Sequence, residues 1–104
     1  MQLLTQADFD AFVSAKPAAA IHFDTVWDVS YRTSMRNTMK YAEQMLGENV
    51  NFGEVDCDKS PELAGSIPVL NVPLVAYYRD GKLVASVIGA NQDVRENLEG
   101  ILHV

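Results

Sequence analysis

The chain has 104 residues, of which 48% are hydrophobic and 21% charged, and its formal net charge is −6 at pH 7. This length fits one domain, and the composition is that of a globular protein rather than of a disordered or collagen-like chain. The acidic balance argues against a surface that follows nucleic-acid phosphates. The longest uninterrupted apolar run, Leu74 to Tyr78, is far shorter than the roughly 20 residues of a membrane span. Neither nucleic acid nor a membrane is therefore an expected partner.

The N-terminal stretch MQLLTQADFD lacks the basic region and the long apolar run of a signal peptide. We therefore expect a cytoplasmic protein. Cys57 is the only cysteine, so an internal disulfide is excluded and a metal cluster cannot be built from thiols. No metal and no cofactor are expected.

The first half of the chain predicts a short strand before the first helix and then alternating helices and strands. Thr5 suits a helix N-cap, and the helix ends at Lys16 because Pro17 disfavours the helical conformation in the residue before it. Residues 18–23 are nearly all apolar, as in a strand that is buried on both faces. A long amphipathic helix is expected over 29–46, with an apolar stripe of Tyr31, Met35, Met39, Ala42, Met45 and Leu46.

The second half predicts three strands and two helices. Residues 50–56 alternate like a strand, and a short helix over 61–64 begins after Ser60. Strand 74–78 and the following LVASVIG are joined by a hairpin turn at 79–82, and a helix over 92–102 closes the chain. The early strands should be parallel and the late pair antiparallel, which predicts a single α/β domain over residues 1–104.

Three segments in this order resemble the thioredoxin family. IHFDTVWDVSYR stands where that family has a strand followed by Trp-Cys-Gly-Pro-Cys-Lys, and VDCDKSPELA resembles its third strand and the turn after it. NVPLVAYYRDGKLVASVIGA resembles the family's cis-proline segment, hairpin and closing glycine. The resemblance covers almost the whole chain. It implies a thioredoxin-like fold: a central mixed sheet with helices on both faces and a terminal antiparallel hairpin.

The departures from the family pattern bear on function. Asp28 and Tyr31 replace the two active-site cysteines, with Val29 and Ser30 between them. Disulfide reduction needs a thiolate that attacks and a second thiol that resolves the mixed disulfide, so dithiol-disulfide oxidoreductase activity is not expected. Asp28 is interpreted as the N-cap of the helix that follows. A glutathione transferase-like use of Ser30 or Tyr31 is disfavoured, because the serine of that enzyme family stands at the position of Asp28.

A second departure lies behind this site. Where the family buries an aspartate near a lysine on the next strand, this chain has His22 and Glu54. A buried carboxylate needs a partner, so we expect a structural His22–Glu54 pair. The alternatives are no contact between them, or a pH-sensitive or catalytic role.

Cys57 is flanked by Asp56 and Asp58, which should raise its pKa and leave it a small packing residue. Its alternative role is a one-thiol redox or sensing function in cell redox homeostasis. Asp58 resembles the family aspartate that hydrogen-bonds the tryptophan indole, which implies orientation of Trp27 rather than metal binding.

A basic row follows along the second helix. Arg32, Arg36 and Lys40 recur every four residues and therefore share one helix face. We expect a solvated face, in which Asp28 can pair with Arg32. Docking of an acidic partner is the alternative.

The remaining matches form a binding surface. Trp27, Val72-Pro73 and Ile88-Gly89 match the apolar rim and backbone edge where thioredoxins hold an extended peptide, with the backbone of Val72 pairing as an added strand. The resemblance implies that Pro73 is cis. The alternative is that the cis bond belongs only to the fold, and Trp27 to the core.

The sequence thus favours a redox-inactive thioredoxin-like protein that binds a partner protein or an extended peptide. A chaperone, adaptor or assembly factor would work in this way, as in some hydrogenase-maturation proteins that lack both cysteines. Two alternatives stay open: a one-thiol protein acting through Cys57, and a structural homo-oligomer whose interface is the same apolar rim.

Overall fold

The strands and helices of the computed structural model follow the predicted order, and the structure describes residues 1–25, 27, 29–68 and 70–103. The elements are β1 (Gln2–Leu3), α1 (Gln6–Ser14), β2 (Ala18–Asp24), α2 (Val29–Leu46), β3 (Val50–Asp56), α3 (Pro61–Ala64), β4 (Leu74–Arg79), β5 (Lys82–Ile88) and α4 (Val94–Leu102). The last helix begins two residues later than predicted. Asp93 is its N-cap, since its carboxylate accepts a hydrogen bond from the Glu96 N–H at 3.0 Å.

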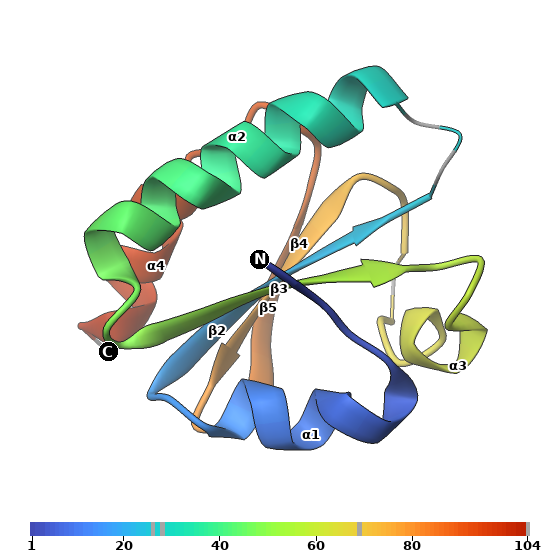
Figure 1. The fold of residues 1–104 in the computed structure, drawn as a ribbon. Helices are drawn as coiled ribbons and strands as arrows, with labels where there is room; N and C mark the ends of the chain where they lie inside the picture. Colours follow the sequence, from blue (N-terminus) through green and yellow to red (C-terminus); the bar gives the residue numbers. More distant parts are fainter. Residues whose placement is uncertain (26, 28, 69, 104) are drawn as a thin grey trace.

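The described strands form one mixed sheet with the order β1-β3-β2-β4-β5. β1 and β2 run parallel to β3, whereas β4 is antiparallel to β2 and β5 is antiparallel to β4. Figure 1 shows α2 and α4 on one face of the sheet and α1 and α3 on the other. This arrangement confirms the predicted central mixed sheet with helices on both faces.

Alternation along β2 divides the core into two layers. Ala19, Ile21 and Phe23 pack in a cluster that includes Phe9 and Val13 of α1. The other face of β2 packs in a second cluster with α2 and α4; its members include Ala18, Ala20, Met35, Met39, Ala42 and Leu98. Because successive strand side chains point to opposite faces, His22 and Asp24 continue the second series and face the α2 side.

α2 differs from its predicted apolar stripe at two positions. Met35, Met39 and Ala42 are fully buried, but Tyr31 and Met45 are exposed. Tyr31 lies in the first turn of the helix, and 56% of its surface is exposed. The buried face of the helix continues from Ala42 to Leu46, and Met45, one residue earlier, points to the side of this face. No helix within the described ranges combines the length and apolar character needed to cross a membrane.

The β4–β5 hairpin turns as predicted and carries a bulge. Asp80 and Gly81 have φ angles of 52° and 81°, as a type I′ turn requires. The register then passes from Tyr78↔Leu83 to Tyr77↔Ala85, so Val84 has no partner opposite it on β4. Such a bulge changes the direction of the side chains next to it.

Candidate functional site

The positions of the two missing cysteines lie where β2 gives way to α2. Asp28 lies outside the described residues, so its role as an N-cap stays a prediction. The helix begins at Val29 and includes Ser30 and Tyr31, as predicted. The exposed Tyr31 ring does not belong to the core, which corrects the predicted stripe.

Trp27, the residue before these positions, lies on the surface. Its side chain is 84% exposed, so the alternative that it belongs to the core is wrong. In the described part of the chain, no hydrogen bond joins the indole to Asp58. The Asp58 side chain is exposed, and its backbone N–H donates to Asp56 Oδ1 at 2.9 Å. The structure therefore shows a tight turn closed by Asp56 rather than the predicted orientation of Trp27 by Asp58.

The peptide bond between Val72 and Pro73 is cis, as the resemblance implied. Pro73 is buried, whereas Val72 is half-buried. The Gly89 N–H donates to the Pro73 carbonyl at 2.8 Å, and Gly89 has a φ of 111°. The cis-proline segment and the end of β5 therefore lie side by side.

The strand register brings the predicted binding residues to one end of the sheet. Leu74 pairs with Phe23 of β2 on one side and with Ile88 of β5 on the other. Trp27 follows β2, and Val72 precedes β4, so both lie beyond this end. Leu70, three residues before Pro73, is also exposed, although the sequence reasoning passed over it. We call Trp27, Leu70, Val72 and Ile88 the apolar rim.

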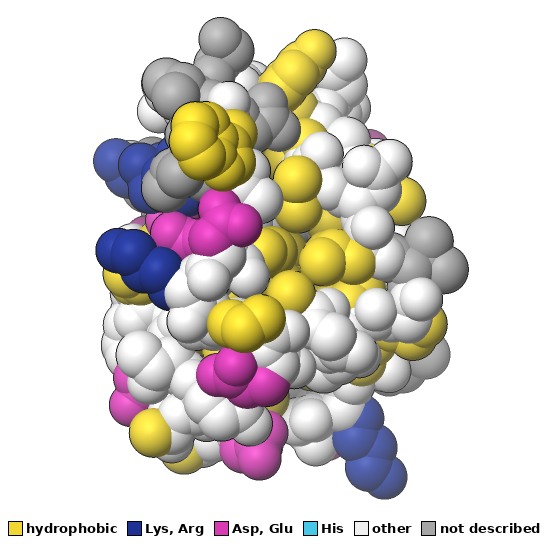
Figure 2. All heavy atoms as spheres, turned by 90° about the vertical axis from the view of Figure 1, so that its right-hand side faces the viewer, with side chains coloured by type: hydrophobic (Ala, Val, Ile, Leu, Met, Phe, Trp, Pro, Cys, Tyr) yellow, Lys and Arg dark blue, Asp and Glu magenta, His cyan; other side chains and the backbone are white. Residues whose placement is uncertain are grey.

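Figure 2 shows the face of the molecule on which α2 begins and α3 lies. Hydrophobic side chains form a band across this face, and basic and acidic side chains gather at one edge of it. An apolar surface beside fixed charges can hold a polypeptide by burial while the charges set its orientation.

Behind this surface lies a cluster of buried ionisable groups. His22 and Asp24 are fully buried, and Glu54, the register partner of His22 on β3, is nearly so. His22 Nε2 is 3.8 Å from Asp24 Oδ2, and His22 Nδ1 is 3.8 Å from Glu54 Oε1. Both distances exceed a hydrogen bond. Among the described residues, neither ring nitrogen has a hydrogen-bond partner.

Two arginines of α2 neutralise these carboxylates. Arg32 Nε donates to Asp24 Oδ2 at 2.6 Å. Arg36 binds Glu54 with a fork of donors, at 2.9 Å from Nη2 to Oε1 and 3.2 Å from Nε to each carboxylate oxygen. The predicted mutual satisfaction of His22 and Glu54 is therefore wrong. A guanidinium offers several charged donors in one plane, and it takes the carboxylate in preference to a neutral imidazole.

This pairing also corrects the predicted solvated basic face. The side chains of Arg32 and Arg36 are only 18% and 42% exposed, because their heads reach down to the sheet. Lys40 is exposed. The partner of Arg32 is Asp24, whereas Asp28 lies outside the described residues.

The charges of this cluster balance. Burial lowers the pKa of His22, and although Asp24 and Glu54 act in the opposite direction, the imidazole is neutral at pH 7. Two carboxylates then face two guanidiniums. The sequence reasoning missed Asp24, but a signal was present: a residue two positions after His22 on a strand shares its face.

Cys57 lies at the same end of the sheet but packs on the opposite layer. Its backbone N–H donates to the Asp24 carbonyl at 2.8 Å, and its half-buried side chain packs against the α1 and α3 core. Burial raises the pKa of the Cys57 thiol, and the nearby carboxylates of Asp56, Asp24 and Asp58 raise it further. The predicted direction is confirmed, with burial as its main cause.

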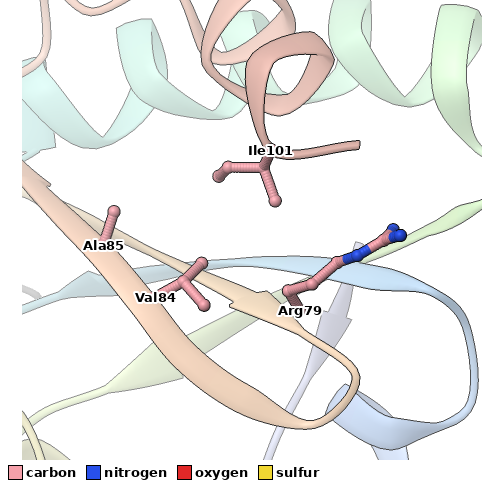
Figure 3. Close-up of a pocket in the computed structure, with 4 residues that line it drawn as sticks. All are labelled: Arg79, Val84, Ala85 and Ile101. Carbon is pink, nitrogen blue, oxygen red and sulfur yellow. The ribbon is translucent and has the colours of Figure 1, made fainter. Parts of the chain in front are cut away.

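A separate hollow lies between β5 and α4. Its volume is about 270 Å³, and it is lined by Arg79, Val84, Ala85 and Ile101. Figure 3 shows Val84 and Ala85 both directed toward the side of α4, as expected where a bulge interrupts the alternation. The sequence reasoning did not single out this hollow.

A mixed sheet covered by helices on both faces, with a cis-proline beside the start of α2, defines the thioredoxin-like fold class. The family model for Thioredoxin matches residues 1–100. The chain therefore belongs to the thioredoxin family.

Comparison with individual proteins agrees with this assignment. The chain is 23% identical to the thioredoxin of Coprinus comatus over 99 residues, covering 94% of this chain and 93% of that protein. It is 26% identical to thioredoxin-1 of Saccharomyces cerevisiae over 90 residues, covering 86% and 85%. The crystal structure of mitochondrial thioredoxin 3 of Saccharomyces cerevisiae in its oxidized form superposes with a TM-score of 0.82 at 26% identity, over 100% of this chain and 95% of that one.

Proposed function

We propose that this protein binds an extended segment of a partner protein along the apolar rim, without dithiol chemistry. The observation that carries the proposal is the 84% exposure of Trp27 at the end of the sheet that also presents the cis-proline segment. A chaperone, adaptor or assembly factor of the cytoplasm is the class of protein that this binding would serve.

The absence of dithiol chemistry follows from the residue types. A carboxylate and a phenol at positions 28 and 31 cannot form and release a mixed disulfide. Cys57 supplies one thiol, which has a raised pKa and packs in the core layer away from α2. A one-thiol redox role is disfavoured on both grounds.

The binding itself has a physical basis. An indole that passes from water into a partner's pocket is among the strongest contributors to protein interfaces, often worth about 2 kcal/mol or more. Beside it, the backbone at the half-buried Val72 can pair with an extended chain, which supplies affinity with little dependence on sequence. Leu70 and Ile88 are further exposed apolar side chains of the rim.

The emission of Trp27, the only tryptophan, tests the proposal directly. We expect unstructured polypeptides and apolar peptides to shift this emission to the blue as the indole leaves water. A Val72→Asp variant should bind at least tenfold more weakly, because the new carboxylate must be desolvated on binding. Met45→Asp, the same kind of change at an exposed apolar residue near the other end of α2, is the control and should bind like the wild type.

Binding that is equal in the Val72→Asp and Met45→Asp variants would move the interface away from the apolar rim. The chemical half of the proposal has its own test, reduction of insulin disulfides with dithiothreitol as electron source. We expect no acceleration above the uncatalysed rate. An acceleration that disappears in Cys57→Ser would instead establish the one-thiol alternative.

One observation favours self-association as a second candidate. β5 is an edge strand whose apolar residues Leu83, Val84 and Ile88 are exposed, and the hollow beside α4 adjoins it. Unprotected edges of this kind pair with other chains. Light scattering decides the question: a dimer that Val84→Asp dissociates supports this candidate, and a monomer removes it.

A further inference from the structure

The buried cluster behind the apolar rim holds an imidazole without a partner between two carboxylates. We propose that His22, Asp24 and Glu54 form a binding site for a divalent first-row transition-metal ion, which replaces the guanidiniums of Arg32 and Arg36 there. This inference is independent of the proposed partner binding.

The sheet itself assembles the three ligands. His22 and Asp24 are two residues apart on one face of β2, and Glu54 stands beside His22 in register on β3. One donor atom from each side chain lies within 4.8 Å of the other two. Metal bonds of about 2.0–2.2 Å hold donors roughly 3.3 Å apart in a tetrahedral site, so side-chain rotations must bring these atoms closer.

The state of His22 points to a missing ligand. Its side chain is fully buried, yet both ring nitrogens lack a partner among the described residues. Buried polar groups in native proteins are almost always satisfied, and an exception calls for an ion or another group. One ring nitrogen can bind the metal together with one oxygen of each carboxylate. The other ring nitrogen faces a carboxylate at 3.8 Å and can donate to the oxygen of it that the metal leaves free, as a metal-bound histidine usually does.

The donor set selects the class of ion. One imidazole nitrogen and two carboxylate oxygens suit zinc, cobalt, manganese or iron. Magnesium and calcium prefer oxygen donors alone, so they fit this set less well.

The charge balance allows the exchange. Asp24 and Glu54 are now matched by two guanidiniums, and a divalent ion restores the same neutrality by itself. Arg36 is 42% exposed and Arg32 18% exposed, so both heads can withdraw to water without crossing the core. Metal binding would therefore release the guanidinium groups of Arg32 and Arg36 at the start of α2, next to the apolar rim.

The test uses the whole chain, freed of metal with EDTA and then titrated with Zn²⁺ by calorimetry and with Co²⁺ by visible absorption. We expect one ion per chain and a Co²⁺ spectrum that His22→Gln abolishes. Asp24→Asn and Glu54→Gln should each weaken binding at least tenfold. His103→Gln removes the other histidine, which is exposed, and Cys57→Ser removes the only thiol; both are controls and should bind like the wild type.

Arg36→Gln is the most decisive variant, because it keeps all three ligands and removes a guanidinium that competes with the metal for Glu54. We expect this variant to bind Zn²⁺ about tenfold more tightly than the wild type, the reverse of what loss of a structural ion pair alone would produce. Circular dichroism in EDTA shows whether each variant is folded.

Three results would overturn the inference: a wild-type affinity weaker than about 100 µM, binding that persists in a folded His22→Gln variant, or binding that His103→Gln or Cys57→Ser removes. Weaker binding by Arg36→Gln would equally contradict the exchange of arginine for metal.

Discussion

Asp24 illustrates how a single buried charge is held in this fold. Its side chain is fully buried, yet one oxygen accepts the Thr25 N–H at 2.7 Å and the other accepts Arg32 Nε at 2.6 Å. Both carboxylate oxygens therefore have donors, which offsets much of the cost of removing the charge from water.

Asp24→Asn should lower the free energy of unfolding by about 2–4 kcal/mol, toward the lower end because Arg32 keeps some access to solvent. Urea unfolding in EDTA at pH 7 measures this change. Glu99→Gln, which breaks the exposed i,i+4 pair with Arg95, is the control and should change stability little. Equal effects of the two substitutions would show that the Arg32–Asp24 contact is not a buried ion pair.

Cys57 should react slowly for a cysteine. Burial raises its thiol pKa, so the thiolate fraction at pH 7.5 is smaller than that of an unfolded chain. We expect iodoacetamide to modify the folded protein more slowly than the same protein in urea. The rate for the folded protein should still rise with pH where the rate for the unfolded protein has become constant. A folded rate equal to the unfolded rate would contradict this view of the thiol.

At the scale of the elements, two glycines make opposite demands on the backbone. Gly81 turns the β4–β5 hairpin with a φ of 81°, and a Cβ there would lie 2.5 Å from Ser14 Oγ. Gly100 lies within α4, where a Cβ would meet nothing within 4 Å. The hairpin needs its glycine, whereas the helix does not.

The same substitution should therefore change stability in opposite directions. Gly81→Ala should cost about 1–2 kcal/mol, because a left-handed residue with a side chain is strained. Gly100→Ala should add about 0.5–1 kcal/mol through helix propensity. Thermal unfolding of both variants gives the comparison, and a neutral Gly81→Ala would mean that the turn changes its type.

At the scale of the molecule, Tyr77 ties the sheet to the segment that carries Gly89. Its hydroxyl donates to Gln92 Oε1 at 2.6 Å and accepts from Asn97 Nδ2 at 3.0 Å. Gln92 Nε2 in turn donates to the carbonyls of Val87 and Gly89, each at 2.8 Å. One buried hydroxyl thus links β4, the end of β5 and α4.

This link predicts a loss of stability in alkali. Burial raises the pKa of Tyr77 to about 12, whereas the unfolded chain releases this proton near pH 10. The contribution is complete below about pH 10 and is lost as the pH rises toward 12, which amounts to about 2–3 kcal/mol. Urea unfolding between pH 8 and about 12 measures the slope. Tyr77→Phe should be less stable than the wild type at pH 8, but it should lose less stability between pH 8 and about 12. A pH dependence equal to that of the wild type would show that another group causes the loss.

The sequence alone determined the order of the elements and the absence of cysteines at positions 28 and 31, because both depend on local properties. The spacing of apolar residues set the range of α2. Ser60 and Pro61 set the start of α3, and Asp80-Gly81 set the position of the hairpin. The residue types at positions 28 and 31 exclude two thiols whatever the fold.

Only the tertiary structure decided how the site is organised. Spacing placed Arg36 on a helix face, but the packing of α2 on the sheet turned its head toward Glu54, which left His22 without a partner. Likewise, the exposure of Trp27, which follows the last residue of β2, depends on where the sheet ends. Donors compete for a buried carboxylate through three-dimensional distance and geometry, and those quantities are set when distant segments pack together.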